Sequence, residues 1–227
     1  MDIPDALTSA TNGMRAQTAQ LDVIARNLAN AATTGYRSRT EAFETYGPEL
    51  AARTDVAQTQ GSLRKTGVPT DLALVGPGYF AIATPDGVRY TRDGRLTIDP
   101  HGCLRDAAGN PLLGSLGPAR FPQGSSILED GRIVARGEVV DRLRVVTFDV
   151  PAQSLDSGLF AAPPGRFPKR SFASVRSGFL EDSGVDAIAQ MTALISAERS
   201  FEADEKSLER TDESLRRLVT EVPVVRT

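Results

Sequence analysis

The chain has one cysteine, one histidine and no tryptophan among its 227 residues. A single cysteine excludes an internal disulfide, and a single histidine excludes a metal site built from several imidazoles. His101 and Cys103 could suggest a Cys–His nucleophile pair, but a spacing of two residues needs a special turn to bring the side chains together. We therefore expect these two residues to occupy turn and strand positions without chemistry. The sequence also lacks nucleotide-binding loops of the Walker or Rossmann type, so we expect neither cofactor nor metal.

The sequence has no excess of positive charge and no long apolar run. Its net charge is −3 and its pI is near 5.3, which argues against nucleic-acid binding by phosphate neutralisation. The mean hydropathy of −0.22 excludes a polytopic membrane protein. The first five residues lack the basic flank and apolar stretch of a secretory signal peptide. The protein is expected either to stay in the cytoplasm or to leave by a route that needs no cleaved signal.

Both ends of the chain carry a heptad pattern. Near the N-terminus, apolar residues fall at strict sevens and predict a helix over residues 1–36 that ends at the left-handed Gly35: Leu7, Met14, Leu21 and Leu28. The C-terminal segment, 177–227, repeats this period: Ala187, Leu194, Phe201, Leu208, Leu215 and Val222. Because a repeat of 3.5 residues favours a supercoiled partner helix, we predict that the two end helices pair with each other as a coiled coil.

The middle of the chain, residues 71–176, has the pattern of short strands separated by turns. Turn dipeptides recur every six to eight residues: Asp86-Gly87, Asp93-Gly94, His101-Gly102 and Gly109-Asn110. Calcium loops need several oxygen ligands within one loop, whereas these acids stand singly at separate turns. The pattern predicts a β-meander, followed by a second β stretch between residues 126 and 148.

Residues 37–70 fit neither pattern. They are rich in Thr and Gln between residues 53 and 63, and we interpret them as an extended arm or an edge hairpin. The predicted fold class is therefore α+β: a mainly β central domain with long N- and C-terminal helices.

Three blocks of sequence resemble the rod and hook group of bacterial flagellar axial proteins. The first resembles the N-terminal signature of that family: Asn27-Leu28-Ala29-Asn30 and Thr34-Gly35-Tyr36. The second is similar to the family's entry into its β-domain: Gln60-Gly61-Ser62-Leu63, Gly78-Tyr79-Phe80 and Tyr90-Thr91-Arg92-Asp93-Gly94. The third is similar to its C-terminal pattern: Leu180-Glu181-Asp182-Ser183 and Arg199-Ser200-Phe201-Glu202. The blocks span nearly the whole chain in the family's order.

The resemblance implies a structural subunit of the flagellar basal-body rod, the periplasmic drive shaft that transmits torque, and no enzyme activity. It implies self-association in a helical assembly, contacts with other rod and hook subunits, and export by the flagellar type III apparatus without a cleaved signal peptide. We expect neither nucleic-acid binding nor membrane insertion. The seams and the resemblance together give an expected assembly interface: Leu7, Met14, Leu21, Ile24, Asn27, Leu28, Asn30, Gly35, Tyr36, Leu194, Phe201, Leu208 and Leu215.

Several alternatives remain open at this point. Chain length argues against the hook, and the compact middle favours the proximal rod over the distal rod. A second class is a β-domain that binds peptidoglycan or a secreted partner and is oligomerised by its terminal helices. An enzyme is third, because Asp86, Asp93 and Asp99 could act as paired carboxylates in glycan hydrolysis, although single acids at turns usually form the turns.

Overall fold

The computed structural model describes residues 3–46, 49–57, 59–155 and 158–221, and within these ranges it leaves out the side chains of residues 3–10, 42–46, 49–54, 208, 211–212 and 214–221. The chain divides into two compact units. The helical unit comprises Met1–Ala29, Arg39–Asp55 and Asp186–Thr227. The β unit comprises Asn30–Ser38 and Val56–Val185.

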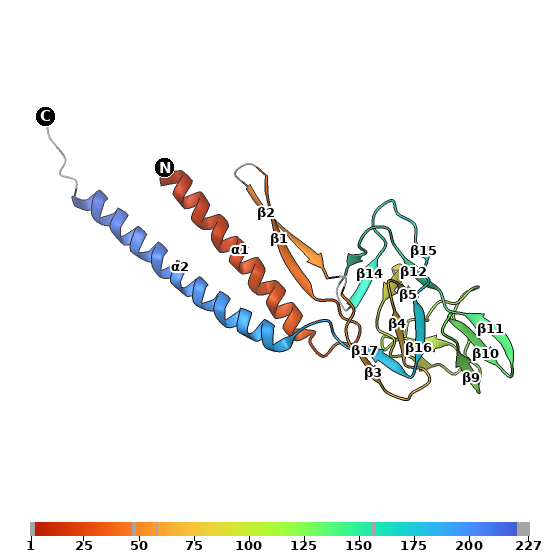
Figure 1. The fold of residues 1–227 in the computed structure, drawn as a ribbon. Helices are drawn as coiled ribbons and strands as arrows, with labels where there is room; N and C mark the ends of the chain where they lie inside the picture. Colours follow the sequence, from red (N-terminus) through yellow and green to blue (C-terminus); the bar gives the residue numbers. More distant parts are fainter. Residues whose placement is uncertain (1–2, 47–48, 58, 156–157, 222–227) are drawn as a thin grey trace. The chain divides into compact units, whose positions relative to one another are not determined.

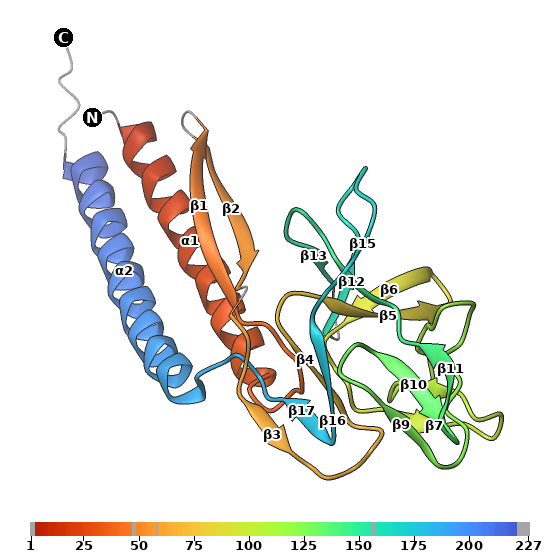
Figure 2. The ribbon, with the colours of Figure 1, turned by 45° about the vertical axis from the view of Figure 1, so that its right-hand side comes forward.

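The helical unit contains the two long helices and one hairpin. Its elements are α1 (Ile3–Ala29), β1 (Arg39–Tyr46), β2 (Glu49–Val56) and α2 (Ala187–Glu221). Helix α1 contacts both α2 and β1 and lies between α2 and the hairpin in both views (Figures 1 and 2). The expectation of a mainly β protein with a helix near each end is confirmed.

Helix α1 buries two of its sides. The neighbouring residues Val23 and Ile24 are 7% and 5% exposed, although they lie about 100° apart around a helix. A single seam, as the sequence analysis expected, leaves one of two such neighbours in solvent. The hairpin on the other side of α1 supplies the second contact, and the heptad pattern contains no sign of it.

The ends of the helices differ from the prediction. Helix α1 ends at Ala29, where the chain turns and the Thr33 amide donates to the Asn30 carbonyl at 3.0 Å. Gly35 is left-handed, with φ +67°, but it does not cap the helix. Helix α2 begins at Ala187 and is capped by Asp186. The Asp186 Oδ1 accepts hydrogen bonds from the backbone amides of Ile188 and Ala189.

The β unit consists of short strands. They are β3 (Leu63–Lys65), β4 (Leu72–Val75), β5 (Tyr79–Thr84), β6 (Gly87–Thr91), β7 (Thr97–Ile98), β8 (Leu104–Arg105), β9 (Ser125–Ile127), β10 (Arg132–Ala135), β11 (Glu138–Arg142), β12 (Val145–Thr147), β13 (Gln153–Ser154), β14 (Leu159–Ala161), β15 (Lys169–Arg170), β16 (Ser174–Ser177) and β17 (Phe179–Glu181).

The strands form one larger sheet and several small ones. The six-stranded sheet has the order β13-β14-β6-β5-β12-β15, and a three-stranded sheet has the order β11-β10-β9. The remaining pairs in this unit are β7 with β8, β16 with β4, and β17 with β3. Strands β16 and β17 return to pair antiparallel with the strands through which the chain entered the unit, so the unit is closed by its own last strands.

Strand β5 lies at the centre of the β unit. Its side chains alternate between two apolar clusters: Phe80 and Ile82 belong to one, and Tyr79 and Ala81 to the other. The first cluster is built mainly from aliphatic side chains of seven strands and the loops between them. The second contains the aromatic contact between Tyr79 and Phe160, whose ring centroids are 4.8 Å apart. Both faces of β5 are therefore covered by core.

Three of the four predicted turns are turns. Gly87, Gly102 and Gly109 all have positive φ. Gly87 lies at the turn from β5 to β6, Gly102 lies at the turn from β7 to β8, and Gly109 lies in the turn after β8. Gly94 does not form a hairpin. A Cβ placed on it would lie 1.7 Å from the Leu72 carbonyl oxygen, so this glycine permits two backbone segments to approach closely.

This close approach makes Gly94 the most sensitive glycine that we can identify in the unit. We expect Gly94→Ala to lower the free energy of unfolding by about 3 kcal/mol or more, because the Leu72 backbone must move. The matched control is Gly13→Ala in α1, where nothing lies within 4 Å of the added Cβ. That change is expected to stabilise the helix by about 0.5–1 kcal/mol. Urea unfolding measures the free energy of unfolding of both variants. Equal changes in the two variants would contradict the interpretation that Gly94 permits a close approach to Leu72.

Candidate functional site

The first candidate site is the surface between the two helices. Polar pairs show that the helices are antiparallel, because Gln17 donates to the Asp204 carboxylate and Asn27 donates to the Gln190 side-chain oxygen at 3.3 Å. The expected seam residues with described side chains are buried or half-buried: Met14, Leu21, Ile24, Leu28, Leu194 and Phe201. The side chains of Leu7, Leu208 and Leu215 lie outside the described part of the structure.

Asn27 connects the three elements of the helical unit. Its Nδ2 donates to the Arg39 carbonyl at 2.8 Å, and its Oδ1 accepts from the Arg39 amide at 2.8 Å. The Asn27 side chain therefore bonds to Arg39, the first residue of β1, as the backbone of a neighbouring strand would. The same amide group reaches Gln190 on α2. Because Asn27 is only 2% exposed, these bonds satisfy a polar group that would otherwise be costly to bury. Within one chain its role is to fix α1 against its neighbours.

Helix α2 carries a second apolar stripe that the sequence analysis missed. Ile188, Met191 and Ile195 are 78%, 51% and 51% exposed, and their spacing of three and four places them on one side of the helix. They lie roughly 100° around the helix from Leu194 and Phe201, on an adjoining side. The spacing of these three residues is present in the sequence, but the strict heptad predicts only the side of α2 that holds Leu194 and Phe201.

Asn30, Gly35 and Tyr36 belong to the β unit, so the structure does not bring them to the helix seam. The Asn30 side-chain oxygen accepts from the Thr33 hydroxyl at 3.1 Å, and the Tyr36 carbonyl accepts from the Gly184 amide at 2.9 Å. A Cβ on Gly35 would lie 2.5 Å from the carbonyl carbon of Arg92. These contacts lie within one chain, and a role of the three residues between subunits stays a prediction.

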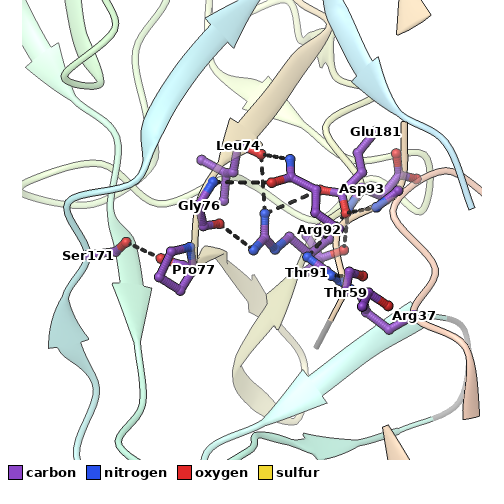
Figure 3. Close-up of polar contacts among 12 residues, drawn as sticks. Arg37, Thr59, Leu74, Gly76, Pro77, Thr91, Arg92, Asp93, Ser171 and Glu181 are labelled. Carbon is purple, nitrogen blue, oxygen red and sulfur yellow. Dashed lines mark hydrogen bonds and ion pairs between the residues drawn. The ribbon is translucent and has the colours of Figure 1, made fainter. Parts of the chain in front are cut away.

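The second candidate site is a buried ionic network in the β unit. The Glu181 carboxylate lies between two guanidinium groups: Arg37 Nη2 is 3.2 Å from Oε1, and Arg92 Nη1 is 3.2 Å from Oε2 (Figure 3). All three side chains are at most 4% exposed. Both oxygens of the carboxylate are therefore used, and Oε1 also accepts from the Gly61 amide at 3.2 Å.

Backbone carbonyls complete the network (Figure 3). Arg92 donates to the Gly76 carbonyl at 2.6 Å and to the Leu74 carbonyl at 3.4 Å, while Arg37 donates to the Thr59 carbonyl. The Glu181 carbonyl in turn accepts from the Gly35 amide at 2.8 Å. The network thus ties the first segment of the β unit, the segment that follows β6 and the last strand to one another.

Burial dominates the electrostatics of this network. It lowers the pKa of Arg92, and the neighbouring Glu181 carboxylate acts in the opposite direction. Burial also raises the pKa of Tyr79, whose ring lies 5.7 Å from the Arg92 guanidinium carbon. Two guanidinium groups share one carboxylate, so the carbonyl oxygens must supply the remaining negative potential. This arrangement holds backbone segments in place.

Two of the three acids that suggested an enzyme, Asp93 and Asp99, accept hydrogen bonds from backbone amides. Asp99 Oδ1 accepts from the amides of His101 and Cys103 at 2.9 and 2.8 Å, and its Oδ2 binds Arg105 at 2.6 Å. Asp93 Oδ1 accepts from the Arg95 amide at 3.0 Å. In the described part of the chain, no three His, Cys, Asp or Glu residues gather to hold a metal ion, and neither described helix has the length and apolarity of a membrane span.

Comparison with known proteins decides the family. Three family models match in order: "Flagella basal body rod protein" over residues 7–37, "Flagellar hook protein FlgE/F/G D1 domain" over residues 73–140, and "Flagellar basal body rod FlgEFG protein C-terminal" over residues 176–221. The chain is 32% identical over 217 residues to the flagellar basal-body rod protein FlgF of Mesorhizobium japonicum, covering 87% of this chain and 89% of that relative. The chain belongs to the flagellar basal-body rod protein family.

Other relatives carry related names. FlgF of Caulobacter vibrioides is 34% identical over 224 residues, with 88% of this chain and 90% of the relative covered. FlgG of Agrobacterium fabrum is 31% identical over 250 residues, with 92% and 95% covered. The resemblance drawn from the sequence blocks is confirmed, and these names support the role of a structural rod subunit. Arg37, Arg92 and Glu181 of this rod protein each fall in a different one of the three matched segments.

Removing the shared carboxylate should be costly. Glu181→Ala leaves two buried guanidinium groups facing each other, and we expect the free energy of unfolding to fall by about 3–5 kcal/mol. Glu181→Gln keeps the shape and one acceptor, so its loss should be smaller. Urea unfolding of both variants measures the difference. If the alanine variant were as stable as wild type, the network would not hold the β unit together.

Asp93 gives a pH-dependent prediction. Burial raises its pKa from the ordinary value of 3.8, so the folded state binds the proton more tightly than the unfolded chain. The stability that this group contributes is present below pH 3.8 and is lost as the pH rises through the folded pKa. We therefore expect Asp93→Asn to unfold at a higher temperature than wild type at pH 7, with the difference vanishing near pH 3.

Asp99→Asn is the matched control for the pH series. Hydrogen bonds, first that from the Cys103 amide, lower the pKa of Asp99, so its contribution is lost as the pH falls. The two variants should therefore show opposite trends in thermal unfolding between pH 3 and pH 7. Parallel trends would contradict the opposite directions of the pKa shifts of Asp93 and Asp99.

Proposed function

We propose that this structural rod protein is a FlgF-type subunit of the proximal rod, with a FlgG-type position in the distal rod as the second choice. It polymerises into the periplasmic shaft that transmits torque for motility. The chain is 32% and 34% identical to FlgF of two bacteria and 31% identical to FlgG of a third, and these identities support this order. No catalysis is part of the proposal, because the buried charges and turn carboxylates already serve the fold.

The observation that carries the proposal is the exposed stripe on α2. One face of α2 packs on α1, while Ile188, Met191 and Ile195 remain in solvent on another face. Exposed apolar surface costs roughly 25 cal/mol per Å², so a helix with two apolar faces favours a second partner. We propose that α1 and α2 form an antiparallel coiled coil within the subunit and that this stripe packs against a neighbouring subunit.

The proposed interface divides the predicted residues into two groups. Met14, Leu21, Leu28, Leu194 and Phe201 hold α1 to α2 and keep the stripe in position. Asn30, Gly35 and Tyr36 act indirectly by fixing the chain where it enters the β unit. Leu7, Leu208 and Leu215 extend the seam on the heptad pattern alone. We retain the four expected segments of the chain, 1–36, 37–70, 71–176 and 177–227, as a functional division.

The proposed partners follow from the family. The subunit associates with copies of itself and with other rod and hook subunits, and it reaches the basal body through the flagellar type III export apparatus without a cleaved signal peptide. Heterologous contacts that do not close produce helical polymers, and this is the symmetry that a shaft requires. Gold-labelled antibody on purified hook–basal bodies tests the location: label on the rod is expected, and absence from intact basal bodies would contradict it.

The stripe can be tested without disturbing the monomer. Ile188→Asp places a charge on a side chain that is 78% exposed, so the purified variant should melt at the wild-type temperature. In cells that lack the wild-type chain, the variant should fail to enter basal bodies and should not restore swimming. Ser200→Asp on another exposed side of α2 is the control and should support motility. Normal motility of the Ile188 variant would refute the role of the stripe.

A further inference from the structure

A short loop of the β unit exposes two aromatic rings. We call residues 166–172 the basic aromatic loop; it contains β15, an edge strand of the six-stranded sheet. Phe167 is 87% exposed and Phe172 is 95% exposed. Large aromatic side chains contribute strongly to binding when they are buried at an interface, and they are rarely this exposed in isolation. Because the two rings lie on either side of β15 and are almost fully exposed, we expect a binding partner to cover them.

The loop is also positively charged. Arg166, Lys169 and Arg170 are all exposed. Lys169 binds Asp149 at 2.8 Å, whereas Arg166 and Arg170 form no ion pair with the described residues. A cavity of about 520 Å³ borders the loop and is lined by the guanidinium-bearing residues Arg142, Arg144 and Arg170 and by Pro168, with Asp130 as its one acidic residue among the described lining. A positive, partly hollowed surface thus lies beside β15.

Protection of the sheet edge explains only part of this surface. Lysine and arginine on an edge strand discourage unwanted strand pairing. That purpose does not account for two exposed phenylalanines, which make aggregation more favourable. An interface explains both features, since aromatic anchors supply apolar contact and surrounding charges select the partner.

We propose that the basic aromatic loop binds an acidic surface on a second copy of this chain. The proposal rests on the proposed rod function. A second copy offers the opposite charge on one side of α2, where four exposed acids recur at spacings of three and four: Glu198, Glu202, Glu205 and Glu209. Two such loops repel each other, and the contact must therefore join two different surfaces. A contact of this kind does not close on itself and continues from subunit to subunit, as a shaft requires.

Photo-crosslinking in cells identifies the partner directly. Phe172→p-benzoylphenylalanine is expressed as the full chain in cells that lack the wild-type protein, and hook–basal bodies are purified after irradiation. We expect a product of twice the chain's mass that contains two copies, joined between residue 172 and an acidic segment. The same photo-reactive residue at Val88, 41% exposed elsewhere in the β unit, is the control. Crosslinks from residue 172 to another protein or to cell-wall glycan would overturn the proposal.

Charge reversal tests the electrostatic part. Arg144→Glu with Arg170→Glu should lower the copies of this chain per basal body by at least about tenfold, because acidic surfaces would then face each other. Lys65→Glu with Arg120→Glu makes the same change in net charge at exposed positions outside the loop and should leave the copy number unchanged. Thermal unfolding confirms that both variants fold. Equal losses, or no loss in either, would overturn the proposal.

The two levels of inference can fail separately. If the wild-type chain is absent from basal bodies, the proposed function fails. If the wild-type chain is present and the loop variants enter basal bodies normally, only the proposal for the basic aromatic loop fails.

Discussion

The β unit depends on one carboxylate. Glu181 binds two guanidinium groups that come from distant parts of the chain, and all three side chains are removed from solvent. A buried ion pair is not a source of large net stability, but breaking it leaves charges that have no alternative partner. The network therefore selects one arrangement of the first segment of the β unit, the segment that follows β6 and the last strand. The close approaches at Gly35, Gly61 and Gly94 all occur around this arrangement.

The helical unit follows a different rule. Its polar contacts, Asn27 with Arg39 and Gln17 with Asp204, set the positions of α1, α2 and the hairpin, while the apolar residues provide most of the buried surface. One apolar face of α2 is satisfied within the chain and one is not. In the proposed assembly, packing within the chain and association with a neighbouring subunit use different sides of the same helix. The β unit repeats this division, since its core is closed while the basic aromatic loop is exposed.

Local patterns were sufficient for some of these features and insufficient for others. The heptads predicted both helices, and the glycine turns predicted the hairpin between β5 and β6, because each depends on neighbours in sequence. Strands β16 and β17 were missed, since strands of four and three residues that pair with β4 and β3 carry no periodic signal of their own. Arg92 and Glu181 stand in two of the blocks that resemble the family, but only the fold shows that they meet each other and Arg37. Gly94 looked like a turn because sequence does not reveal which carbonyl lies opposite.

The closure of the β unit by its last strands affects when the unit can form. Arg92 and Glu181 are 89 residues apart in sequence, and β17 pairs with β3 across more than a hundred residues. A growing chain exposes both arginines long before their shared carboxylate exists. Contacts of such high sequence separation form slowly, because a large loop must close first. The N-terminal part of the chain consequently has no complete core of its own, and a chain in that state can be threaded through a narrow passage before it folds.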